Sequence, residues 1–304
     1  MDCSVQKSRH PGILLVSTTD FFFPLVDDPY LQGRIGCANV LSDMYAMGVR
    51  DCDSVLMLIA ASTDMTPPER NIVTELMMKG FNDLCTEAGT KVTGGQTVLN
   101  PWPIIGGVAE AVVTETELII PEHAVAGDVI VLTKPLGTQP AVNVMQWMNK
   151  NEPLWAKAKD VITPEEVSAA YLAAMNSMAR LNRTGAGLMH KHGVHAATDV
   201  TGFGILGHAD NLAKNQRAEV TLRLHTLPVI NKMDKVNEIF DFKLLAGRSA
   251  ETSGGLMVCL PAAAAEAFIA DIVAADGCPA WIIGDVVAGP RQGELVESPR
   301  ILSV

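Results

Sequence analysis

The chain has 304 residues, 48% of them hydrophobic, and a formal net charge of −11 at pH 7. This length is enough for two domains with ordinary cores. The acidic balance disfavours nucleic-acid binding, which would need a basic surface. Residues 1–12 contain no apolar signal core, and charged residues interrupt every long apolar run before it could span a membrane. We therefore expect a cytoplasmic protein that binds neither nucleic acid nor membranes.

Local signals predict one helix in the first half of the chain with particular clarity. Thr66 can cap its N-terminus, Pro67 suits the first helical position, and Glu69 completes a capping box. Periodicity also predicts a strand within residues 13–17, a second helix within 33–48 and a strand within 55–60. Residues 90–113 are predicted to form a strand, a glycine loop and another strand.

A stretch with the composition of a linker, residues 119–128, places a domain boundary near residue 122. Beyond it, Thr163, Pro164 and Glu166 repeat the capping chemistry at the start of another helix. Strands are expected over 128–134, 218–224, 254–260 and 280–287, and a helix over 261–275. Because strands and helices do not alternate cleanly, the pattern predicts an α+β or mixed α/β fold with two domains, 1–122 and 123–304.

Four aspartates at boundaries between apolar segments and turns are candidates for chemistry: Asp2, Asp20, Asp43 and Asp199. Carboxylate oxygens of this kind suit Mg²⁺, which prefers hard ligands and substrate phosphates. Asp20 precedes three phenylalanines, where an unpaired buried acid would be costly, so we expect it to be exposed, hydrogen-bonded or paired with a positive charge. Taken singly, each aspartate is more simply explained as a cap or turn residue.

Two glycine-containing stretches, TGGQT at 93–97 and ATDVTGFGILGH at 197–208, could bring backbone N–H groups close to phosphate. Neither is a Walker loop or a dinucleotide fingerprint, and ordinary turns would also explain them. His190, His192 and His195 do not have a recognised zinc spacing. The six cysteines form no C-x-x-C pair and are expected to be reduced thiols, mostly buried.

Several long motifs resemble those of selenophosphate synthetases, namely STTDFF, VTGGQTVLNPW, IVLTKPLGTQ, TGFGILGH and ETSGGL. The resemblance runs in register along the chain. It implies ATP-dependent conversion of selenide to selenophosphate, with AMP and orthophosphate as the other products. It also implies the two-domain fold of aminoimidazole ribonucleotide synthetase and a homodimer joined through the N-terminal domains.

Position by position, the resemblance assigns magnesium binding to Asp2, Asp43 and Asp199. It assigns nucleotide binding to Asp20, Asp43, Gly94, Gly95, Gln96 and Thr97. The implied cofactors and substrates are Mg²⁺, ATP and selenide, and a role for K⁺ is left open.

In the family, a segment upstream of the first magnesium aspartate carries a catalytic Cys or selenocysteine and a Lys. We expect both to lie upstream of Met1, because Cys3 and Lys7 match other positions. No catalytic residue is therefore assigned within 1–304, and the chain alone is expected to make no selenophosphate. The alternatives are a non-catalytic ATP-binding paralogue with a regulatory or partner-binding role and another ATP-using enzyme of the superfamily, such as a cyclo-ligase.

Overall fold

The computed structural model describes residues 2–150 and 153–304, so the expectation tied to Met1 lies outside the described residues. The chain divides into two compact units. The first runs to Ile119 and includes Ala179–Gly187, and the second comprises Ile120–Met178 and Leu188–Val304. The division after residue 122 stays a prediction, and the two units are described separately.

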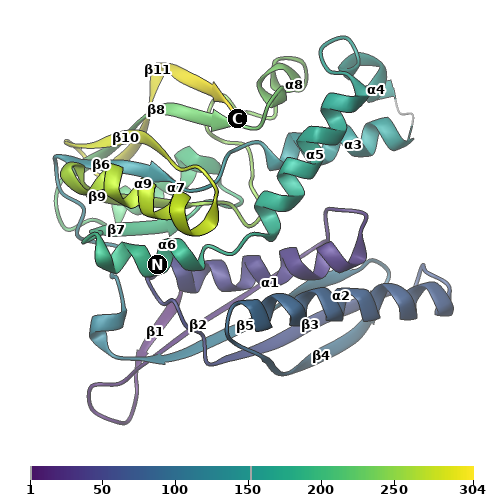
Figure 1. The fold of residues 1–304 in the computed structure, drawn as a ribbon, viewed down its shortest axis with the longest axis horizontal. Coiled ribbons are helices and arrows are strands. Elements are labelled where there is room, and N and C mark those ends of the chain that lie inside the picture. The colour runs from purple at the N-terminus through teal and green to yellow at the C-terminus, as the bar shows by residue number, and fades with distance from the viewer. Residues whose placement is uncertain (1, 151–152) are drawn as a thin grey trace. The chain divides into compact units, whose positions relative to one another are not determined.

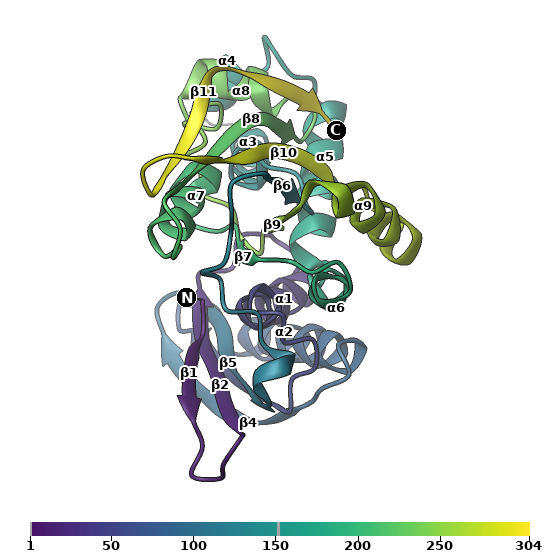
Figure 2. The same cartoon turned by 90° about the vertical axis from the view of Figure 1, so that its left-hand side faces the viewer.

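The first unit is a five-stranded sheet in the order β1-β2-β5-β3-β4, with helices α1 and α2 on one face (Figures 1 and 2). All its strand pairs are antiparallel except β3 with β4. Its elements are β1 (Ser4–Lys7), β2 (Leu14–Phe22), α1 (Pro29–Ala46), β3 (Ser54–Ser62), α2 (Pro67–Glu87), β4 (Val92–Asn100), β5 (Ile104–Val113) and a short 3₁₀ helix (Glu115–Glu117).

Helix α1 is buried along most of its length, which explains why it is apolar on nearly all sides. It packs against α2 at very short range. A Cβ at Gly33 would lie 2.1 Å from the carbonyl oxygen of Met77, and one at Gly80 would lie 1.9 Å from that of Tyr30. Glycine is therefore required at both positions for the two helix backbones to meet.

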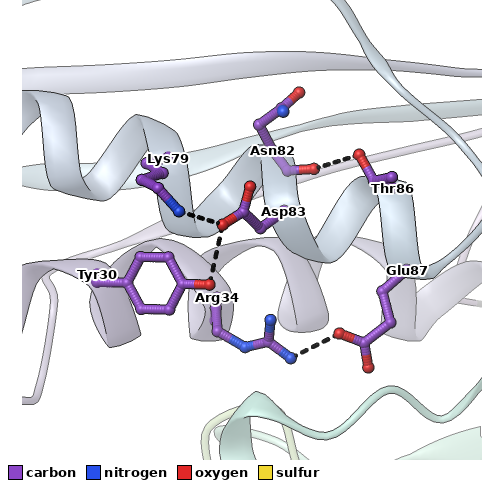
Figure 3. A network of polar contacts seen from close by, with 7 residues as sticks. All are labelled: Tyr30, Arg34, Lys79, Asn82, Asp83, Thr86 and Glu87. Carbon is purple, nitrogen blue, oxygen red and sulfur yellow. Dashed lines mark hydrogen bonds and ion pairs between the residues drawn. The ribbon is translucent and has the colours of Figure 1, made fainter.

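A polar network joins α1 and α2 along one side of this contact (Figure 3). The Tyr30 hydroxyl donates to Asp83 at 3.0 Å, and Lys79 donates to the same carboxylate at 2.6 Å. Arg34 pairs with Glu87 at 2.8 Å. These groups are partly exposed, so they contribute mainly to the alignment of the helices and little to net stability.

The second unit contains a six-stranded sheet in the order β11-β8-β10-β6-β9-β7, with one parallel pair, β11 with β8. Its strands are β6 (Asp128–Leu132), β7 (Ala196–Asp199), β8 (Val220–Val229), β9 (Leu256–Pro261), β10 (Trp281–Ala288) and β11 (Gln292–Ser303). The helices in this part of the chain are α3 (Thr138–Lys150), α4 (Pro153–Ala158), α5 (Pro164–Ala179), α6 (Arg183–Lys191), α7 (Gly204–Lys214), α8 (Met233–Phe240) and α9 (Ala262–Asp276). None of the described helices is long and apolar enough to cross a membrane.

The mixed α/β class and both capping boxes are confirmed. The Glu69 carboxylate accepts the backbone N–H of Thr66 at 2.9 Å, and Glu166 accepts that of Thr163 at 2.9 Å. Strand β11 was not predicted. It lies at a sheet edge, carries Pro299 and has a register shift between Leu295 and Arg300, all of which weaken a strand signal.

Two local expectations about the candidate residues were wrong. Residues 94–97 are not a loop, because they lie inside β4, where pairing with β3 extends the backbone. Asp20 does not lie at a boundary between an apolar segment and a turn, since β2 continues to Phe22 and Asp20 pairs with Gly107 of β5. In both cases a neighbouring strand supplied hydrogen bonds that local propensity cannot reveal.

Candidate functional site

Two of the predicted aspartates lie in a small polar cluster between β2 and α1. Thr18 and Asp20 project from the same face of β2, and Asn39 and Asp43 lie one turn apart on α1. The Thr18 hydroxyl donates to the Asp43 carboxylate at 2.5 Å, and the Asn39 amide donates to the Asp20 carboxylate. We call these four residues the β2–α1 polar cluster.

The cluster is partly removed from solvent, which matters for its charge. Asn39 and Thr18 are buried. Burial raises the pKa of Asp20, and the hydrogen bonds from Asn39 and from the Phe21 backbone partly oppose that rise. A desolvated carboxylate of this kind is stabilised by a nearby cation. Asn39 and Thr18 were not predicted as site residues, although the four-residue spacing from Asn39 to Asp43 is visible in the sequence.

Asp2 comes directly before a residue that contacts α1. It precedes Cys3, whose thiol donates to the sulfur of Met44 at 3.6 Å, and Met44 follows Asp43 on α1. The start of the described chain is thereby held against the helix that carries Asp43.

Residues 94–97 lie at the opposite side of the same sheet. Strands β5 and β3 separate β4 from β2, a distance of about 14 Å at the usual strand spacing. Gly95 has φ +144°, and a Cβ there would lie 1.9 Å from the Met57 carbonyl oxygen, so only glycine fits. Gln96 and Thr97 are exposed on this edge strand. The first unit therefore does not bring them next to Asp20, and a ligand touching both must span that distance.

Asp199 ends β7 in the second unit and is buried. The chain that follows is held by backbone contacts. Val200 donates to Gly255 at 2.9 Å, and Glu251 donates its N–H to the Thr201 carbonyl at 3.0 Å. A Cβ at Gly254 would lie 2.0 Å from the Val200 carbonyl oxygen, so this glycine permits the close approach.

His208 on α7 holds the same turn through hydrogen bonds. Its Nε2 accepts the backbone N–H of Thr201 at 2.9 Å and lies 3.2 Å from the Thr201 hydroxyl. Burial lowers the pKa of His208 to about 4, so the ring is neutral and can accept at physiological pH.

Glu251 was not predicted, although it lies in the ETSGGL motif. Its carboxylate accepts the backbone N–H groups of Gly137 at 2.7 Å and Thr138 at 2.9 Å, together with the Thr138 hydroxyl. It thereby caps the N-terminus of α3 while its own N–H holds the turn after Asp199. Burial raises the pKa of Glu251 to about 7, and these hydrogen bonds oppose the rise.

Two of the three histidines named above, His192 and His195, pair with carboxylates. His192 lies 2.6 Å from Asp271, and His195 lies 2.8 Å from Asp128. In the part of the chain that the structure describes, no group of three or more His, Cys, Asp or Glu residues is arranged to hold a metal ion. The grouping of Asp2 and Asp43 with Asp199, which belongs to the other unit, therefore stays a prediction.

Family models match both halves of the chain. Residues 1–113 match the N-terminal domain of AIR synthase related proteins, and residues 125–297 match the C-terminal domain. Solved structures agree on the fold. Thiamine-monophosphate kinase from Stenotrophomonas maltophilia has a TM-score of 0.72 at 19% identity, over 96% of this chain and 88% of that one. The hydrogenase maturation protein HypE in complex with ATP has a TM-score of 0.67 at 18% identity, over 93% and 78%. The chain is thus a two-domain AIR synthase related protein.

Relatives with higher sequence identity show which family within this class the chain belongs to. Human selenide, water dikinase 2 is 56% identical over all of this chain, which spans 68% of that relative. The selenide, water dikinases of Dictyostelium discoideum and Leishmania major are 52% and 53% identical, over 100% and 94% of this chain and 85% and 76% of those proteins. The chain belongs to the selenide, water dikinase family.

Proposed function

We propose that this protein takes part in ATP-dependent synthesis of selenophosphate from selenide, with AMP and orthophosphate as the other products. The observation that carries the proposal is the β2–α1 polar cluster in a chain that is 56% identical to a human selenide, water dikinase. Cytoplasmic location is part of the same proposal.

The residues present suit a magnesium nucleotide. Asp2, Asp43 and Asp199 offer hard carboxylate oxygens, and the raised pKa of Asp20 marks a carboxyl group whose ionised form a cation would favour. When bound, Mg²⁺ would offset the negative charge of the phosphates. Thr18 and Asn39 would orient the two carboxylates of the cluster, and residues 94–97 would contact the nucleotide. The role of K⁺ stays open.

The proposal extends to a homodimer joined through the first unit. Helices cover only one face of its sheet, and the other face carries exposed apolar side chains. Leu15 of β2 pairs with Val112 of β5 on that face, where they are 46% and 54% exposed. Phe21 and Val98 belong to the same face by strand alternation. An exposed apolar surface of this kind is typical of a protein interface.

The dimer is tested by light scattering after gel filtration. Val112→Asp should yield a monomer, because it places a charge in the apolar face. Ile72→Asp is the matched control, since Ile72 is 60% exposed on α2, on the covered side of the sheet. Dimers that survive Val112→Asp would contradict this interface.

Nucleotide binding is tested by calorimetry with ATP and Mg²⁺. Asp43→Asn should weaken the binding of both together, because the carboxylate and the phosphates share the cation. Asp64→Asn, at an exposed turn residue of the same unit, is the control. Full ATP affinity in Asp43→Asn, with unchanged dependence on metal, would overturn the site assignment.

The reaction itself is tested by phosphorus NMR with ATP, Mg²⁺, K⁺ and selenide. The prediction is that residues 1–304 alone make no selenophosphate, and that the chain with a segment carrying the Cys or selenocysteine and the Lys fused ahead of Met1 does. Selenophosphate from the short chain would contradict the first part. ATP binding without selenophosphate from either form would favour the non-catalytic paralogue.

A further inference from the structure

Two buried thiols face each other across the α1–α2 contact. Cys37 lies four residues after Gly33 on α1, and Cys85 lies five residues after Gly80 on α2. Their sulfur atoms are 3.4 Å apart, and neither residue is exposed to solvent. No assigned site uses either of them.

The backbone contact explains why the sulfur atoms come so close. At Gly33 and Gly80 the helices touch through backbone atoms, with no side chain between them. The helices also run in the same direction, since Tyr30 meets Asp83 and Arg34 meets Glu87 further along both. Cys37 and Cys85 each lie about one helical turn after the glycine of their own helix, so they remain at the contact between the two helices.

We propose that Cys37 and Cys85 form a reversible disulfide, which makes the α1–α2 contact a site of oxidative modification by hydrogen peroxide. Closing the bond requires the sulfur atoms to approach from 3.4 Å to about 2.05 Å. The proposal does not depend on the proposed function.

The chemistry has two steps. One thiol, as its thiolate, attacks a peroxide oxygen, so the O–O bond breaks, a sulfenic acid forms and hydroxide leaves to take up the released proton as water. The sulfur of the second thiol then attacks the sulfenic sulfur, the S–O bond breaks and a second water leaves with its proton. In total, two thiols lose two electrons and two protons to one peroxide molecule, which becomes two water molecules.

Burial makes this oxidation slow and selective. It raises the pKa of the Cys37 thiol well above its usual value, so little thiolate exists while the helices stay closed. Reaction therefore requires peroxide to enter during brief opening of the contact. Cys52, the other nearby thiol, already donates to the carbonyl oxygens of Ser54 and Glu110 at 3.3 and 3.1 Å, so we expect it to stay unlinked.

The bond would hold α1 from the side opposite the β2–α1 polar cluster. Cys37 contacts α2, whereas Asn39, two residues later, contacts Asp20 on β2. The linkage would therefore tie the helix that carries Asp43 to α2 without occupying the cluster.

The test is non-reducing peptide mapping after peroxide treatment, in a Cys278→Ser background that removes the one thiol that is not buried. The chain is alkylated in denaturant and digested with trypsin. Cleavage after Arg34 and Arg50 places Cys37 alone in one peptide, and cleavage after Lys79 and Lys91 places Cys85 alone in another. The expected product is these two peptides joined, lighter by two hydrogen atoms than their sum, and separated by dithiothreitol.

Cysteine variants distinguish a Cys37–Cys85 disulfide from oxidation at other cysteines. Cys37→Ala and Cys85→Ala should each abolish the joined product, and the matched control Cys52→Ala should retain it. Prolonged peroxide treatment that continues well after Cys278 of the unsubstituted chain is fully oxidised, and that still leaves Cys37 and Cys85 open to alkylation, would overturn the proposal. So would a bond from either cysteine to Cys52. Mapping of the unsubstituted chain gives this answer even if a variant fails to fold.

Discussion

Replacing Glu251 by glutamine should change how the stability of the second unit depends on pH. The pKa of Glu251 rises from 4.5 in the unfolded chain to about 7 in the folded one, because the carboxyl group is fully buried. The folded state therefore keeps a proton that the unfolded state has lost. This stabilisation is complete below pH 4.5 and is lost as the pH rises through about 7. Between pH 5 and 8 the loss amounts to roughly 2 to 3 kcal/mol.

His208 has the opposite effect on the same unit. Burial lowers its pKa from 6.5 to about 4, so its stabilising contribution is present above pH 6.5 and is lost as the pH falls through about 4. From pH 5 to 8 this contribution grows by about 2 kcal/mol. The two groups nearly cancel in the natural chain. Glu251→Gln removes the contribution of Glu251 and keeps that of His208. The free energy of unfolding of this variant should therefore rise with pH from 5 to 8.

The assay is urea unfolding at pH 5, 6, 7 and 8, followed by tryptophan fluorescence. A Trp102→Phe background confines the signal to the second unit, whose tryptophans are Trp147, Trp155 and Trp281. The stability advantage of the parent over Glu251→Gln should fall by roughly 2 to 3 kcal/mol from pH 5 to 8. Glu266→Gln, an exposed acid on α9, is the control and should show no such trend. A constant difference between parent and Glu251→Gln would refute the reasoning.

Further predictions concern the first unit. Gly95→Ala should destabilise it by about 3 kcal/mol or more, because φ is +144° and the new Cβ would overlap the Met57 carbonyl, as urea unfolding would measure. Gly94→Ala should cost about 1 kcal/mol or less, since its Cβ would meet only a side chain at 3.4 Å, and equal losses would contradict this account. Asn39→Leu should lower the affinity for magnesium ATP about tenfold in calorimetry, because Asp20 loses a charge-assisted hydrogen bond. An unchanged affinity would show that Asn39 only fills space.

The local elements of this fold could be predicted where the signal lies within a few residues. Thr66 with Glu69 and Thr163 with Glu166 are three residues apart, so their capping bonds form whenever the helix does. The family could be identified from long motifs for the same reason, since these depend on residue order alone. The four-residue spacing from Asn39 to Asp43 likewise predicts that both side chains share one face of a helix.

Tertiary structure decided the features that join distant parts of the chain. Residues 94–97 became a strand because β3 pairs with them, and Glu251 caps a helix whose first residue lies 113 positions earlier. Cys37 meets Cys85 over a separation of 48 residues. The sequence by itself determined helix starts, the mixed fold class and the family. Only the folded chain decided which strand pairs with the glycines, which acid is buried and which thiols touch, because those outcomes depend on hydrogen bonds and desolvation between segments that are remote in sequence.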